Sequence, residues 1–168
     1  MADAPDLLTA HAVNQGDKMA VIDDRGEGDV RQLTYGELEQ HSNRLAHVLL
    51  EHGVTRGDKV VWCGQNSTGI VNMVNAARKI GATAVPLNYR LSDEEAAYVV
   101  DHSDAATVYV DAEFAPMFER MAAEIPKVAN VFVFDGAPPA SAAAMTGIDP
   151  LVDAAPDTPP EVALSLIH

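Results

Sequence analysis

The sequence has few cysteines, few aromatic residues and no long apolar run. Cys63 is its single cysteine, so an internal disulfide and a cysteine-rich metal site are excluded, and a reducing, cytoplasmic compartment is expected. Uncharged stretches are short or broken by Gly, Pro, Asn and Ser, which predicts no membrane span. The start MADAPDLLTAHAV lacks a basic region and a long apolar core, so we expect no secretory signal.

Basic residues are also scarce, with 11 against 25 acidic residues and a net charge of −14. The excess is regional, because residues 93–124 carry nine acids and a single base, Arg120. Such a surface repels phosphate backbones and anionic lipid headgroups, so we expect no nucleic-acid partner. A solvated face that keeps the protein soluble explains these acids without a specific function.

What the sequence does have is a regular alternation of apolar runs and helical patterns. Strands are predicted at 59–64, 83–88, 107–110 and 130–135, and helices at about 67–80, 93–103 and 113–124. The middle runs are almost continuously apolar, as in buried parallel strands. The pattern predicts an α/β fold: a doubly wound, mostly parallel sheet with helices on both faces.

The N-terminal part adds a short helix at 6–15 and an antiparallel β-hairpin formed by 19–24 and 30–35. Two pairs have capping-box spacing and predict helix starts, Thr34 with Glu37 and Ser92 with Glu95. The helix over 67–80 should bury an apolar stripe made of Ile70, Met73, Val74 and Ala77. Pro86 suggests that its strand is ending there.

The chain divides into an α/β subdomain at 1–134, an Ala/Pro-rich connection at 135–160 with a short helix near 146–154, and a strand at 161–168. This last run, EVALSLIH, ends on apolar residues, so we expect the chain to be the N-terminal part of a longer protein. The exposed apolar edge predicts self-association, seen as an apparent mass that rises with concentration and salt.

Two strand ends carry candidate binding residues. Asn66 and Ser67 lie in GQNST, where backbone amides at a helix start can hold an anion; alternatively one of them only caps the helix. Arg90 lies in PLNYRL and can face a carboxylate or phosphate; alternatively it pairs with Glu94 or Glu95.

Other catalytic patterns are absent from the sequence. It has no HExxH, no G-x-S-x-G and no GxxxxGK[ST] motif. Three of its six histidines share one helix at spacings of six and five residues, which do not place metal ligands on one face. No metal site and no catalytic residue are therefore predicted.

Two segments together resemble a known family. LTYGEL (33–38) and AARKIGATAVPLNYRL (76–91), at the spacing seen here, resemble the first two core motifs of the AMP-forming acyl-CoA synthetases, in the adenylate-forming superfamily. The resemblance spans about residues 6–134 and is nearest to the fatty and aromatic acyl-CoA ligases. In that family a phosphate loop follows a strand such as VALSLIH, and the catalytic motifs lie further on.

The resemblance implies that the parent protein uses ATP, Mg and CoA to convert a fatty or aromatic carboxylate into acyl-CoA, AMP and pyrophosphate. None of these ligands is expected to bind residues 1–168 alone, which should be inactive. The alternative interpretation is a non-catalytic α/β module that binds a small molecule or another protein. A coding sequence that continues past His168 into a glycine-rich loop would favour the ligase.

Overall fold

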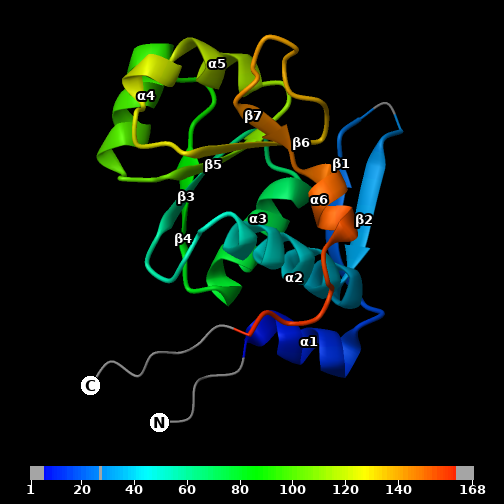
Figure 1. Cartoon of the computed structure of the whole chain (residues 1–168). Coiled ribbons are helices and arrows are strands. Elements are labelled where there is room, and N and C mark those ends of the chain that lie inside the picture. The colour runs from blue at the N-terminus through cyan, green and yellow to red at the C-terminus, as the bar shows by residue number, and fades with distance from the viewer. Residues whose placement is uncertain (1–5, 27, 162–168) are drawn as a thin grey trace, which may run out of the picture.

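The computed structural model describes residues 6–26 and 28–161 (Figure 1). Its centre is a five-stranded, all-parallel sheet in the order β4-β3-β5-β6-β7. The strands are β3 (Lys59–Cys63), β4 (Thr83–Leu87), β5 (Thr107–Asp111), β6 (Asn130–Phe134) and β7 (Met145–Gly147). The four strands predicted from the sequence lie in this one sheet, which confirms the α/β fold.

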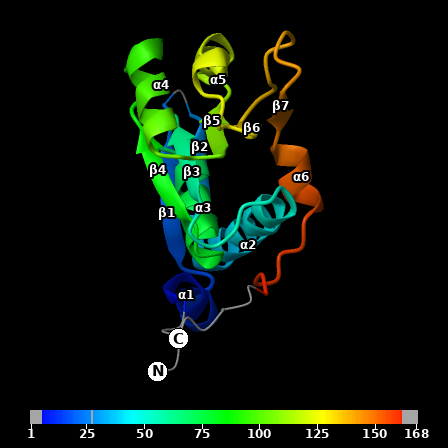
Figure 2. The same cartoon turned by 60° about the vertical axis from the view of Figure 1, so that its left-hand side comes forward.

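Helices cover both faces of the sheet (Figure 2). On one face lie α2 (Tyr35–Glu51), α3 (Thr68–Lys79) and α6 (Asp149–Ala154); on the other lie α4 (Asp93–His102), α5 (Ala115–Arg120) and the 3-10 helix η1 (Ala122–Glu124). An apolar core lies on each face of the sheet, and alternate residues of β3 point into one or the other. Val60 and Trp62 pack toward α2 and α3, whereas Val61 and Cys63 pack toward α4.

The N-terminal segment packs against α2 and α3. It consists of α1 (Leu7–Gln15) and a hairpin of β1 (Met19–Asp24) and β2 (Val30–Thr34), which pair antiparallel as predicted. Both predicted capping boxes form. The Thr34 hydroxyl accepts the Glu37 amide at 3.2 Å, and the equivalent bond from the Glu95 amide to Ser92 is 3.3 Å.

Some local predictions were wrong. Val74 is 43% exposed, because α3 turns Gly69, Met73 and Ala76 inward and leaves Val74 at the margin of its buried stripe. The helix expected over 113–124 is divided into α5 and η1. The prediction that the strand ends near Pro86 was right, because β4 ends at Leu87; Pro86 itself fits in β4, since β4 is an edge strand and one side of it needs no ladder hydrogen bonds.

The connection at 135–160 contains the predicted short helix, α6, and also β7, which was not predicted. β7 has only three residues and pairs with β6 from Val131 to Val133. The strand predicted at 161–168 falls outside the described residues except for Glu161, which is not in a strand.

Two glycines at the second position of their helices provide a test of the packing. A Cβ added at Gly69 would lie 2.8 Å from Cδ2 of Phe134, whereas at Gly36 the nearest atom would be 3.4 Å away. We expect Gly69→Ala to lower the free energy of unfolding in urea by about 1–3 kcal/mol through overpacking. Gly36→Ala should raise it by about 0.4–1 kcal/mol. Equal effects of the two substitutions would contradict this packing of α3 on β6.

Candidate functional site

A cavity of about 450 Å³ lies at the carboxyl end of the sheet. Its walls come from the segments that follow β3, β5 and β6, together with the end of β1. β4 and β5 lie on opposite sides of β3, so the strand order reverses between β3 and β5. Ligands of open α/β sheets bind at such a reversal. This cavity is therefore the candidate site, and we call it the switch-point cavity.

The switch-point cavity is strongly acidic. Its charged lining consists of five carboxylates and one guanidinium: Asp23, Asp24, Asp111, Glu113, Asp135 and Arg25. Arg25 is paired twice, with Asp23 at 3.2 Å and with Asp135. Because Arg25, the basic residue of the lining, is already paired with two carboxylates, the cavity keeps a net negative charge. It therefore repels phosphates and carboxylates and favours cationic or neutral groups.

The helix start beside this cavity is already occupied. The Thr68 amide at the first turn of α3 donates to Oδ2 of Asp23 at 2.9 Å. Ser67 is the N-cap by position, but its side chain makes no capping hydrogen bond. The prediction that Asn66 or Ser67 caps this helix was wrong, because the carboxylate of β1 takes that role. It also takes the place that an anion would use at the helix N-terminus.

Two carboxyls of the cavity differ in their titration. Burial raises the pKa of Asp111, the amide of Glu113 opposes this, and the charge of Asp135 adds to the rise. Burial also disfavours the charge of Asp135, but hydrogen bonds from Arg31 and Arg25 outweigh it and lower the pKa of that carboxyl. Asp135 is thus a paired anion, whereas Asp111 is the carboxyl that takes up a proton more readily.

The structure places two of the three predicted site residues in the cavity. Asn66 and Ser67 line it, and the Ser67 hydroxyl is buried without a hydrogen-bond partner among the described residues. Arg90 is exposed after β4, outside this lining, with its guanidinium 5.3 Å from the Tyr89 ring centroid. The described residues show no ion pair between Arg90 and the neighbouring glutamates 94 and 95. A role of any of the three in substrate binding stays a prediction.

The acidic residues of the cavity were not predicted from the sequence. Asp111 is the last residue of β5, and Asp135 directly follows β6. The rule that ligands bind beyond the carboxyl ends of parallel strands would have selected both. The contribution of Asp23 could not be found in this way, because it comes from a hairpin outside the parallel sheet.

Comparison with known proteins identifies the family. The family model described as AMP-binding enzyme matches residues 8–165. The chain belongs to this family. 3-Hydroxybenzoate–CoA ligase of Aromatoleum sp. (strain CIB) is 35% identical over 158 residues, which make up 93% of this chain and 28% of that protein. Crotonobetaine/carnitine–CoA ligase of Citrobacter koseri is 37% identical over 109 residues, 65% of this chain and 21% of that protein. The chain therefore spans less than a third of either relative.

Solved structures of other proteins share the fold. The inhibitor-bound N-terminal domain of FACL13 from Mycobacterium tuberculosis has a TM-score of 0.81 at 24% identity, covering 94% of this chain and 37% of that one. The anthranilate CoA ligase AuaEII, solved with anthranoyl-AMP, also has a TM-score of 0.81, at 22% identity, with 94% and 28% covered. At these identities the likeness concerns the fold alone.

No described helix is both long enough and apolar enough to span a membrane.

Cys63 is buried in β3. Its burial, and to a smaller extent the charge of Asp111, raise the pKa of its thiol to about 12. A thiol with that pKa stays protonated at neutral pH, so Cys63 is a core residue and not a nucleophile.

The opposite pKa shifts of Asp111 and Asp135 predict opposite effects of neutral substitutions. Asp111→Asn should stabilise the protein near pH 7, because it removes a half-buried charge that Asp135 repels. This gain in stability should shrink as the pH falls through the raised pKa of Asp111, because the wild-type carboxyl then becomes neutral as well. Asp135→Asn should destabilise the protein near pH 7. This loss of stability should shrink as the pH falls below 3.8, the ordinary pKa of an aspartate, and through the lowered pKa of Asp135.

Urea unfolding of both variants and the wild type as a function of pH measures these differences. A loss of stability in Asp111→Asn near pH 7 would contradict the assignment of Asp111 as a half-buried carboxylate that forms no ion pair with the other described residues. A stability of Asp135→Asn equal to that of the wild type at that pH would contradict the pairing of Asp135 with the two arginines.

Proposed function

We propose that this chain is part of an AMP-forming acyl-CoA ligase that acts on an aromatic or fatty carboxylic acid. The match of the AMP-binding model to residues 8–165 carries this proposal. It is supported by relatives whose names specify CoA ligation of hydroxybenzoates and of crotonobetaine or carnitine, and by a fatty acid–[acyl-carrier-protein] ligase of Streptomyces coeruleorubidus. The cytoplasm is the proposed location.

The proposed reaction has two steps. A carboxylate oxygen of the acid attacks the α-phosphorus of ATP, and pyrophosphate leaves, which gives an acyl-adenylate. The CoA thiol, losing its proton, then attacks the acyl carbon, and AMP leaves as the thioester forms. Negative charge develops on phosphate oxygens and on the carbonyl oxygen, so both steps need cationic or amide donors at fixed positions.

The described residues contribute little to these donors. The switch-point cavity carries five carboxylates, and Asp23 already fills the N-terminus of α3. Arg90 is the exposed cation at the carboxyl end of β4, and we propose it, with Asn66 and Ser67, as a contact for substrate groups. We also propose that residues 1–168 alone are inactive, since the remaining donors would come from elsewhere in the ligase. Self-association of the chain is a separate proposal, which rests on the apolar sequence at 161–168.

Magnesium accompanies ATP in this proposal. Among residues 6–26 and 28–161, no three His, Cys, Asp or Glu side chains are placed to hold a metal ion. The carboxylates of the switch-point cavity therefore do not fit the ion, although they are numerous. Its ligands would lie elsewhere in the proposed ligase.

Exchange of labelled pyrophosphate into ATP tests the proposal. We expect a full-length ligase that contains this sequence to catalyse exchange when given benzoates or fatty acids, and to form acyl-CoA when CoA is added. The 168-residue chain should do neither. A folded full-length protein with no exchange over a broad panel of acids would contradict the ligase. Tight ATP binding by residues 1–168 would instead favour the small-molecule-binding module.

A further inference from the structure

Three of the five carboxylates of the switch-point cavity are not neutralised by a base. Asp24, Asp111 and Glu113 line the cavity and form no ion pair with another described residue. The hydrogen bonds that they accept, at 3.0–3.1 Å, come from uncharged donors, which are two backbone amides and the side chain of Gln65. The cavity therefore offers three negative charges to a cation that enters it.

The hydroxyl of Ser67 is a second group of this cavity whose bonding is incomplete. Ser67 lines the cavity at the start of α3 and is only 7% exposed. Its Oγ has no hydrogen-bond partner among the described residues, because Asp23 accepts the helix amide in its place. Buried polar atoms are normally hydrogen-bonded, so this oxygen points to a partner outside the described residues. An N–H donor that enters the cavity would satisfy it.

An apolar groove of about 440 Å³ adjoins the switch-point cavity between β1 and α3. The two share four lining residues, Ser67 among them, so they are continuous. The other walls of the groove are aliphatic: Val21, Ile22, Ile70 and Val71. Ile22 is 64% exposed and is open to contact with a ligand. We call this the hairpin groove. A molecule that fills both parts is cationic at one end and aliphatic at the other.

The arrangement of the acceptors narrows the kind of cation. In the part of the chain that the structure describes, no three ligating side chains converge closely enough to hold a metal ion. A primary ammonium group suits separate acceptors better, because it rotates and can direct its three N–H donors to different segments of the chain. The planar fork of a guanidinium is instead suited to two parallel bonds with one carboxylate. A volume of about 450 Å³ is ordinary for a small-molecule site.

We propose that the switch-point cavity and the hairpin groove together bind a small primary alkylamine in its protonated form. The ammonium group donates to the carboxylates of Asp111 and Glu113 and to the hydroxyl oxygen of Ser67. The alkyl chain lies along Ile22 in the hairpin groove, where it loses contact with water. This site is separate from the acyl-CoA chemistry of the proposed function, and the inference does not depend on that function.

NMR titrations of the isotope-labelled chain at pH 7 test the proposal with three matched probes. Pentylamine has both parts of the expected ligand, methylamine has only the ammonium group, and pentanol has the chain without the charge. We expect pentylamine to shift the amide signals of 65–67 and 111–113 in a saturable way. It should bind about tenfold more tightly than methylamine, because burial of its methylene groups adds to the affinity. Pentanol should give no saturable shift, and an affinity of pentanol equal to that of pentylamine would overturn the proposal.

Substitutions separate the two halves of the site. Asp111→Asn should weaken the binding of both amines about tenfold, and Ser67→Ala about threefold, because each removes an acceptor of the ammonium group. Ile22→Ser should weaken pentylamine about threefold or more and leave methylamine unchanged, since only the longer amine reaches the hairpin groove. Glu94→Gln and Val13→Ser are the matched controls, an exposed acid and an exposed aliphatic residue that line neither part, and they should change nothing.

Three further results would overturn the site. One is an Asp111→Asn variant that binds pentylamine as tightly as the wild type does. Another is a set of shifts spread over the acidic segment at 93–124, which would mean that the amine only follows the net charge of −14. The third is tighter binding of N-acetyl-lysine amide than of pentylamine, which would indicate a lysine of a partner protein as the occupant in place of a free amine.

Discussion

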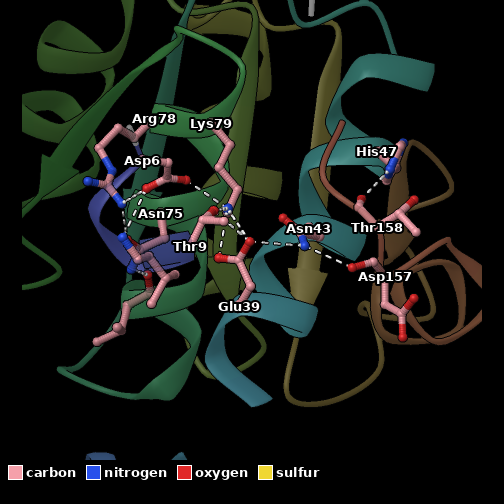
Figure 3. A network of polar contacts seen from close by, with 12 residues as sticks. Asp6, Thr9, Glu39, Asn43, His47, Asn75, Arg78, Lys79, Asp157 and Thr158 are labelled. Carbon is pink, nitrogen blue, oxygen red and sulfur yellow. Dashed lines mark hydrogen bonds and ion pairs between the residues drawn. The ribbon is translucent and has the colours of Figure 1, made fainter. Parts of the chain in front are cut away.

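The buried ammonium group of Lys79 is the interaction on which the N-terminal layer of the structure depends. Its side chain is 3% exposed, and Nζ lies 2.7 Å from Oδ2 of Asp6 and 2.9 Å from Oε1 of Glu39. Asp6 caps α1, Glu39 belongs to α2 and Lys79 to α3, so moving α1 or α2 away from α3 breaks one of the two ion pairs of the buried Lys79. Through Glu39 the same network reaches Asn43, which donates to the carbonyl oxygen of Asp157 at 2.8 Å (Figure 3).

The Lys79 network and the switch-point cavity involve different residues. At the carboxyl end of the sheet, acids line the switch-point cavity and Asp23 occupies the start of α3. A nucleotide would find few favourable charges there. The described residues instead supply a parallel sheet and a backbone segment at 153–158 that side chains of α2 hold by hydrogen bonds.

Local signals predicted most of this fold. Thr34 and Ser92 form their capping boxes, because such bonds involve residues three apart and the sequence contains all that they need. Contacts between distant segments were not predictable in this way. Asp23 caps a helix that begins 45 residues later, and β7 is recognisable only by its pairing with β6. For the same reason Asn66 and Ser67 were placed at the right strand end, but with the wrong capping role.

Replacing Lys79 tests the dependence on its buried charge most directly. Lys127 is the natural comparison, since it also lies near two carboxylates, Asp101 and Asp104, but is 47% exposed. In urea unfolding, Lys79→Met should lower the free energy of unfolding by about 3–5 kcal/mol, because Glu39 stays buried without its cation. Lys127→Met should lower it much less, because water and salt screen an exposed ion pair. Similar losses for the two substitutions would contradict the account.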